Sequence, residues 1–143
     1  MARNPMSVVP SLVSYMATGF HLFCEQEEKY PYRSDILDII DFYYQYPREA
    51  MAKLPRQDNM VVDYDSLVVD PTGTVLDVYT RLNLEMGEKY RETLKLETKN
   101  ARKYKSTHDY SLEDMGLSRQ AILSMYSDSY QDYQFDPLIE EAK

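Results

Sequence analysis

The sequence has a single cysteine, no tryptophan and only four glycines among its 143 residues. Because one cysteine cannot pair within its own chain, Cys24 excludes an internal disulfide and a zinc site built from several cysteines. No apolar run approaches the roughly 20 residues that span a bilayer, and residues 1–5 carry no apolar signal-peptide region. We therefore expect no membrane span and no signal peptide. The compartment of such a soluble protein stays open between the cytoplasm and the Golgi lumen.

Basic residues are also scarce. Sixteen Lys and Arg stand against 24 Asp and Glu, which gives a formal net charge of −8 and a pI near 4.7. Non-specific nucleic-acid binding needs a basic face, so this composition argues against nucleic acid as a partner. An anionic ligand must therefore be held by a few well-placed basic side chains, against the field of the whole protein.

Tyrosine and apolar residues are what the chain has in abundance. Hydrophobic residues make up 43% of the sequence and charged residues 28%, which is typical of a globular domain able to bury a core. The 14 tyrosines each combine a ring that packs with a hydroxyl that stays hydrated, a combination suited to the rims of clefts and to interfaces. We interpret most of them as half-buried packing residues.

Apolar periodicity predicts helices in the first part of the chain. One covers residues 5–23. A second is capped by Ser34 and broken by Pro47, and a short piece follows over residues 48–54. The core-facing stripe of the second helix is expected to contain Ile36, Leu37, Ile39, Ile40, Tyr43 and Tyr44.

Residues 60–64 form the one predicted strand, because the segment is short and rich in β-branched residues. A single strand cannot make a sheet. The chain is therefore either a helical domain with one odd strand or a domain whose other strands lie outside it.

Cap residues locate the helices that follow. Asp70 caps a helix that opens at Pro71, and a more polar helix covers residues 85–99. Residues 102–108 have no helical periodicity and are interpreted as a loop.

The last part of the chain carries two further helix signals. Residues 111–114 fit a capping box, and Gly116 is placed to close that turn in the left-handed conformation. Ser118 caps the last helix, whose apolar stripe reaches Tyr133.

Three blocks, in this order and over nearly the whole chain, resemble the later half of the sulfotransferase domain that uses 3′-phosphoadenosine 5′-phosphosulfate (PAPS). The first is Arg-Asn-Pro at 3–5 with a serine at position 11. The second, V-D-Y-D-S-L-V-V-D-P over 62–71, is similar to the family's strand, Tyr-Glu-Asp-Leu and Asp-Pro sequence, with Asp-Ser where Glu-Asp is usual. The third, H-D-Y-S-L-E-D-M-G-L over 108–117, is close to a C-terminal signature of one branch.

The resemblance implies a fold class and a reaction. The expected fold is α/β, a partial P-loop-like sulfotransferase domain that is mostly helical in this chain, with residues 1–143 as the C-terminal portion of a single domain. The family transfers a sulfuryl group from PAPS to a hydroxyl or amine acceptor by in-line attack on sulfur. PAPS is thus the implied co-substrate, and an acceptor of that class is the implied partner of the complete enzyme.

The resemblance also assigns the nucleotide-binding residues. Arg3 and Ser11 match the family residues that hold the 3′-phosphate, and a guanidinium fork with a hydroxyl donor suits a phosphate. Lys103 and Lys105 lie where related enzymes bring basic residues to the nucleotide, but we interpret them as a solvated charged run. His108 is interpreted as a packing residue of its loop.

No phosphosulfate-binding loop is present in the sequence. Family members hold the 5′-phosphosulfate with a glycine-containing loop analogous to a P-loop, whereas Gly19, Gly73, Gly87 and Gly116 stand in other contexts. The resemblance thus implies that the N-terminal phosphosulfate part is absent, and no catalytic or metal-binding residue is assigned. Because the transition state would lack contacts at the sulfonate, we predict that this chain alone does not transfer sulfuryl groups.

Two alternatives stay open. One is that the chain is a non-catalytic helical interaction module built on the same scaffold, which associates through exposed apolar surface. The other is that it is a self-contained acidic helical domain unrelated to sulfuryl transfer.

Overall fold

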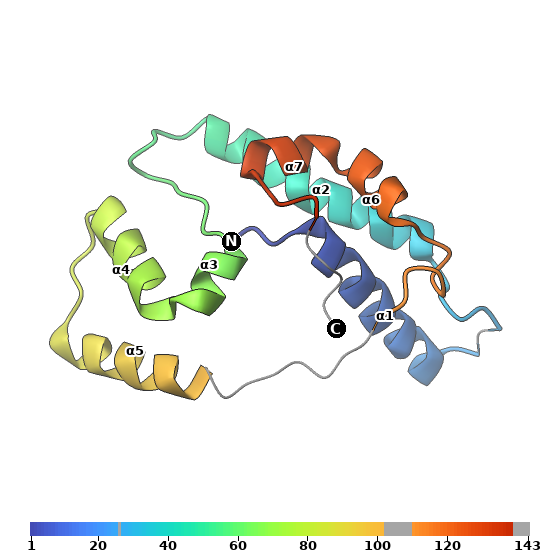
Figure 1. Cartoon of the computed structure of the whole chain (residues 1–143), viewed down its shortest axis with the longest axis horizontal. Helices are drawn as coiled ribbons and strands as arrows, with labels where there is room; N and C mark the ends of the chain where they lie inside the picture. Colours follow the sequence, from blue (N-terminus) through green and yellow to red (C-terminus); the bar gives the residue numbers. More distant parts are fainter. Residues whose placement is uncertain (26, 102–109, 139–143) are drawn as a thin grey trace. The chain divides into compact units, whose positions relative to one another are not determined.

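A computed structural model describes residues 1–25, 27–101 and 110–138 of the chain (Figure 1). The chain divides into two compact units. The smaller unit contains Met1–Arg3 and Ala50–Ser106, and the larger unit contains Asn4–Glu49 and Thr107–Lys143. The helices of the described residues are α1 (Pro5–Phe23), α2 (Arg33–Ala52), α3 (Tyr64–Val69), α4 (Pro71–Arg81), α5 (Glu88–Ala101), α6 (Arg119–Met125) and α7 (Ser127–Tyr133).

The predicted α/β fold class is wrong for the part of the chain that the structure describes. These residues contain no sheet, and the predicted strand over 60–64 does not form. Their β pairing is limited to one isolated parallel bridge between Ala2 and Asp63. A short β-branched run stays a strand only where neighbouring strands pair with it, and here Ala2 alone does so.

A helix cap ends the extended segment at Asp63. On its N-terminal side, the Ala2 amide donates to the Val62 carbonyl at 2.8 Å, and the Tyr64 amide donates to the Ala2 carbonyl at 2.8 Å. The Asp63 carboxylate then accepts from the Ser66 amide at 2.8 Å and so caps α3. The extended segment therefore turns into a helix directly after its paired residue.

Helices α3, α4 and α5 make up most of the smaller unit, with α4 packed against both others. The predicted start of α4 is confirmed, since the Asp70 carboxylate accepts from the Gly73 amide at 3.0 Å and Pro71 is the first helical residue. The predicted helix over 85–99 is confirmed with shifted bounds, as α5. A hydrogen bond of 2.8 Å between the Thr72 and Thr98 hydroxyls joins α4 to α5.

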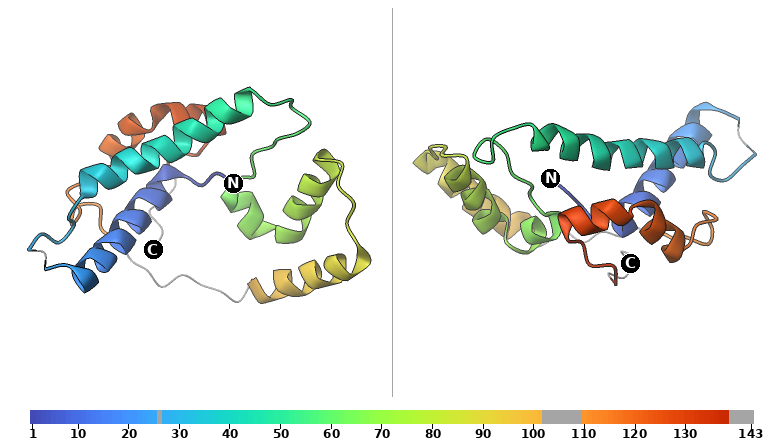
Figure 2. Two further views of the ribbon diagram at one scale, coloured as in Figure 1. Left: turned by 180° about the vertical axis from the view of Figure 1, so that it is seen from behind. Right: turned by 90° about the horizontal axis from the view of Figure 1, so that it is seen from above.

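The larger unit has its core between α1, α2, α6 and the turn before α6 (Figures 1 and 2). The predicted helix over 5–23 is confirmed as α1, whose cap is Asn4. The side chains that are almost completely buried are Met6, Val9, Val13, Ile40, Leu112, Met115, Ile122 and Tyr126.

Helix α1 is the one helix of the described residues that is long and apolar enough to cross a membrane by length and composition. Its inward side carries Met6, Val9 and Val13, which lie in the core of the larger unit. A core helix passes the same length and composition test as a membrane span, so this is weak support for a span. In the structure, 33% of this apolar window is buried.

Helix α2 differs from its prediction at both ends. It begins at Arg33, so Ser34 lies inside the helix, and it continues through Pro47 to Ala52. Tertiary contacts hold its middle: the Tyr126 hydroxyl donates to the Leu37 carbonyl at 3.1 Å, and the Tyr133 hydroxyl donates to the Tyr44 carbonyl at 3.3 Å. Packing along the helix thus outweighs the local cost of a proline near its end.

The turn before α6 ends in a Schellman motif, as its glycine predicts. The Ser111 hydroxyl accepts from the Asp114 amide at 3.2 Å, the Leu117 amide donates to the Leu112 carbonyl at 2.9 Å, and Gly116 has φ +65°. The Ser118 hydroxyl accepts from the amide three residues on at 3.2 Å, which confirms it as a cap. The predicted last helix is divided into α6 and α7 at Tyr126.

Candidate functional site

Arg3 lies in the smaller unit, one residue after the bridge between Ala2 and Asp63. Its guanidinium carbon lies 4.5 Å from the centre of the Tyr64 ring, over the ring face. A stacked guanidinium keeps its N–H groups in its own plane, where they donate at the edge. The ring therefore orients the plane in which Arg3 donates hydrogen bonds.

Ser11 lies in the larger unit, on α1, and is half-buried. The Tyr110 hydroxyl donates to the Ser11 hydroxyl oxygen at 3.5 Å. Tyr110 comes from the third sequence block and Ser11 from the first, so a hydrogen bond connects two of the blocks that resemble the sulfotransferase domain. The Ser11 hydroxyl can also donate a hydrogen bond of its own to a phosphate oxygen.

The shared phosphate site of Arg3 and Ser11 stays a prediction, because the two residues belong to different units. Ser66, which stands where the family usually has a carboxylate, donates its hydroxyl to the Asp63 carboxylate at 2.8 Å and has a local capping role. The predicted loop over 102–108, with its two lysines and one histidine, lies outside the described residues.

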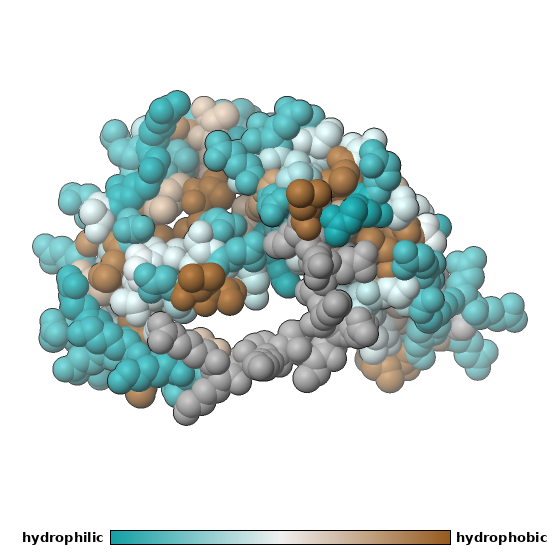
Figure 3. Space-filling view, in the orientation of Figure 1, coloured by the Kyte–Doolittle hydropathy of each residue, from teal (hydrophilic) through white to brown (hydrophobic). Residues whose placement is uncertain are grey.

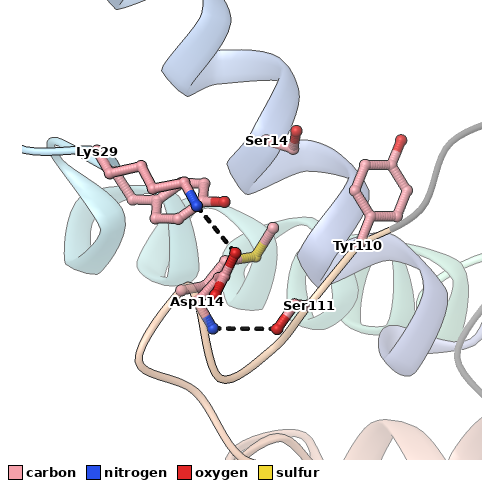
Figure 4. A pocket seen from close by; sticks show the side chains of 7 residues that line it. Ser14, Lys29, Tyr110, Ser111 and Asp114 are labelled. Carbon is pink, nitrogen blue, oxygen red and sulfur yellow. Dashed lines mark hydrogen bonds and ion pairs between the residues drawn. The ribbon is translucent and has the colours of Figure 1, made fainter.

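A polar pocket of about 380 Å³ opens beside Ser14 in the larger unit (Figure 4). Figure 4 shows Lys29 reaching Asp114 across the pocket, with Ser111 beside Asp114 and Tyr110 on the other side. The pocket is lined by Ser14, Lys29, Tyr30, Tyr110, Ser111, Asp114 and Met115. Sequence reasoning missed it, because its walls come from segments far apart in the chain.

The charges of this pocket cancel. The Lys29 ammonium lies 2.9 Å from the Asp114 carboxylate, and this hydrogen bond raises the pKa of Lys29 above its ordinary value. Both side chains are more than half exposed, so the pair contributes little to stability. The His21 ring contacts the Lys29 carbonyl at 2.9 Å, which gives this histidine a structural role in the same loop. A lysine engaged in this way is a poor phosphate-binding group.

Charge is distributed unevenly between the two units. The larger unit holds five of the 16 basic residues and 15 of the 24 acidic residues, which gives it a formal charge of −10. The smaller unit, which contains Arg3, holds 11 basic and nine acidic residues and is therefore at +2. Electrostatic attraction for an anion thus belongs to the smaller unit, and attraction for a cationic partner belongs to the larger one.

A row of exposed apolar side chains follows one face of α2. Ile39, Phe42, Tyr43 and Tyr46, which we call the aromatic stripe, are between 48% and 67% exposed. The prediction that Ile39 and Tyr43 face the core is wrong, because the buried residues of α2 are Ile36, Leu37, Ile40 and Tyr44. In the sequence, the aromatic stripe is visible as a second set of apolar residues with i, i+3, i+4, i+7 spacing.

Large apolar side chains reach the surface elsewhere as well, and Figure 3 shows hydrophobic groups beside hydrophilic ones on the face that it draws.

Within the described ranges, no group of three or more His, Cys, Asp and Glu side chains is placed to hold a metal ion. Comparison of the chain with protein-family models, with curated proteins and with solved structures finds no match.

Proposed function

We propose that this chain belongs to a PAPS-dependent sulfotransferase and grips the 3′-phosphate of the nucleotide through Arg3 and Ser11. The acceptor of the complete enzyme would be a hydroxyl or an amine. By itself the chain binds the nucleotide and does not catalyse sulfuryl transfer.

One observation carries the proposal: the three sequence blocks that suggested it are connected in space. Arg3 of the first block stacks over the Tyr64 ring of the second, with its guanidinium carbon 4.5 Å from the ring centre, beside the parallel bridge between Ala2 and Asp63 in the smaller unit. Ser11 of the first block accepts a hydrogen bond from Tyr110 of the third, inside the larger unit. Both contacts are of the kind that segments of one domain make, and in this way they support the proposal.

The chemistry of the two residues supports the same role. The Arg3 guanidinium, oriented over Tyr64, offers a planar donor pair to phosphate oxygens. The four glycines give no phosphate-binding loop: Gly19 lies inside α1, Gly73 in the first turn of α4, Gly87 directly before α5 and Gly116 in the Schellman turn. None of the four glycines therefore gives the described residues a loop of amide donors for the sulfonate, which is why we expect binding without turnover.

Titration calorimetry with adenosine 3′,5′-bisphosphate tests the proposal. We expect the wild-type protein to bind it, and Arg3→Ala to raise the Kd by about tenfold or more, the loss expected for a charge-assisted hydrogen bond. Arg56→Ala, which removes an exposed arginine of the same unit, is the matched control and should leave the Kd unchanged. Ser11→Ala should weaken binding less, and Ser124→Ala on the exposed side of α6 should not weaken it.

Two results would contradict the proposal. One is the failure of wild-type protein to bind adenosine 3′,5′-bisphosphate. The other is equal affinity for adenosine 5′-monophosphate, which lacks the 3′-phosphate. Sulfuryl transfer from PAPS by the purified chain to phenolic, alcoholic or amine acceptors would overturn the prediction that it is inactive alone.

A second candidate function is a protein-interaction module. The observation that favours it is the aromatic stripe, a set of large apolar side chains exposed on one face of α2.

A further inference from the structure

The aromatic stripe has the geometry of a helix-binding face. Its four residues recur at i, i+3, i+4 and i+7, so they lie on one side of α2. The Phe42 and Tyr46 rings stack at 5.3 Å with an interplanar angle of 20°, and Phe42 also contacts Tyr43 edge-on at 6.1 Å. The rings therefore order one another before any partner arrives, which lowers the entropy lost on binding.

Acidic side chains border this stripe. At 100° per residue, Asp38 and Glu49 fall along one edge of the stripe, and Asp35 falls at its N-terminal end. All three are exposed. Arg48 lies on another side of α2 and bonds the Asp132 carboxylate of α7 at 2.6 Å, so its charge is engaged inside the unit.

We infer that the aromatic stripe is a docking site for an amphipathic helix of another polypeptide, with an apolar face and Lys or Arg along one edge. The apolar face covers the aromatic rings, and the basic edge pairs with Asp38 and Glu49. The formal charge of −10 on the larger unit attracts such a helix over a longer range. This inference rests on the second candidate function, and nucleotide binding does not depend on it.

The same charges disfavour other occupants. A second copy of the chain would bring its own larger unit, with a formal charge of −10, against the same charge. Like charges across an interface cost on the order of several kcal/mol. A membrane surface rich in anionic lipid would be repelled for the same reason. A cationic partner is the one that both the rings and their acidic border favour.

Fluorescence anisotropy with two labelled synthetic helical peptides tests the inference. The peptides share one Leu and Phe face and differ only at its edge, which carries Lys in one and Glu in the other. We expect the Lys-edged peptide to bind the protein at least about tenfold more tightly, with an affinity that falls as salt rises. Phe42→Ala combined with Tyr43→Ala should weaken that binding by about tenfold or more, as buried aromatic anchors do.

Matched variants separate the stripe from general stickiness and general charge. Phe23→Ala removes a ring that is 89% exposed at the end of α1, and it should leave the affinity unchanged. Asp38→Lys with Glu49→Lys should remove the preference for the Lys-edged peptide, whereas Glu28→Lys, an exposed acidic site in the same unit, should keep it. Because all these side chains are exposed, circular dichroism should show wild-type folding for each variant.

Three outcomes would overturn the inference. The first is equal binding of both peptides, and the second is binding that the Phe42 and Tyr43 substitutions leave intact. The third is self-association in analytical ultracentrifugation that these substitutions abolish, since a second copy would then be the occupant. The calorimetric titration with adenosine 3′,5′-bisphosphate uses other variants, so either proposal can fail alone.

Discussion

Replacing Asn4 by alanine should strongly destabilise the larger unit. Asn4 is 2% exposed, and its side chain makes three hydrogen bonds. The side-chain oxygen Oδ1 accepts from the Met6 amide at 2.9 Å and from the Tyr130 hydroxyl at 2.9 Å. The side-chain nitrogen Nδ2 donates to the backbone carbonyl of Asp136 at 2.8 Å.

The magnitude follows from these three contacts. Loss of an asparagine N-cap costs about 1 kcal/mol. Each of the other two hydrogen bonds contributes about 0.5–1.5 kcal/mol, and the groups left unpaired in the interior add to the cost. We therefore expect Asn4→Ala to lower the free energy of unfolding by about 2–4 kcal/mol, a large fraction of a typical domain's stability.

Urea unfolding followed by the near-ultraviolet circular dichroism of the tyrosines measures this loss. A double-mutant cycle with Tyr130→Phe should give a coupling free energy of about 0.5 kcal/mol or more between Asn4 and Tyr130, because the two share one hydrogen bond. Asn59→Ala is the control, since its amide bonds only exposed loop carbonyls of the smaller unit. A loss for Asn4→Ala within about 0.5 kcal/mol of the wild type would refute the reasoning.

Two further predictions concern the larger unit. Gly116→Ala should cost about 1 kcal/mol or more in thermal unfolding, because the glycine has φ +65° and an added Cβ would lie 2.6 Å from the Arg33 side chain; an unchanged melting temperature would count against it. Tyr126→Phe removes the hydrogen bond to the Leu37 carbonyl and should cost about 0.5–1.5 kcal/mol at pH 7. Burial raises the pKa of Tyr126, so its contribution is complete below about pH 10 and is lost as the pH rises through the folded-state pKa. The stability of the variant should therefore fall less steeply than that of the wild type in alkaline urea titrations, and parallel curves would contradict the assignment.

Features fixed by neighbours in the sequence were predicted correctly. Asp70, Ser118 and Gly116 act within three or five residues of themselves, so their cap roles are visible in a short window of sequence. The bounds of α1 were predicted for the same reason, since a long apolar helix carries its own periodicity.

Features that depend on distant contacts were not predicted. The strand over 60–64 failed because its persistence depends on partner strands, and one residue, Ala2, provides the pairing. The break expected at Pro47 failed because contacts from Tyr126 and Tyr133 hold α2. Apolar periodicity alone also could not tell which of two stripes on α2 faces the core.

The candidate site was predictable only as residue types. The sequence indicated Arg3 and Ser11 through a family resemblance, but Tyr64 and Tyr110, which contact them, come from segments far along the chain. The ion pair of Lys29 with Asp114 likewise joins segments 85 residues apart, so no local pattern revealed that this lysine is already engaged.

The hydrogen bond between Asn4 and Asp136 can form only when synthesis of the chain is nearly finished. These two residues are 132 positions apart, and the whole of Ala50–Ser106 is synthesised between the two halves of the larger unit. Since a ribosome adds about 5–20 residues per second, α1 and α2 wait several seconds for α6 and α7 after they emerge. During that interval Met6, Val9 and Val13 lack the later segments that bury them in the folded unit, so we expect the nascent chain to expose apolar surface of the kind that chaperones cover.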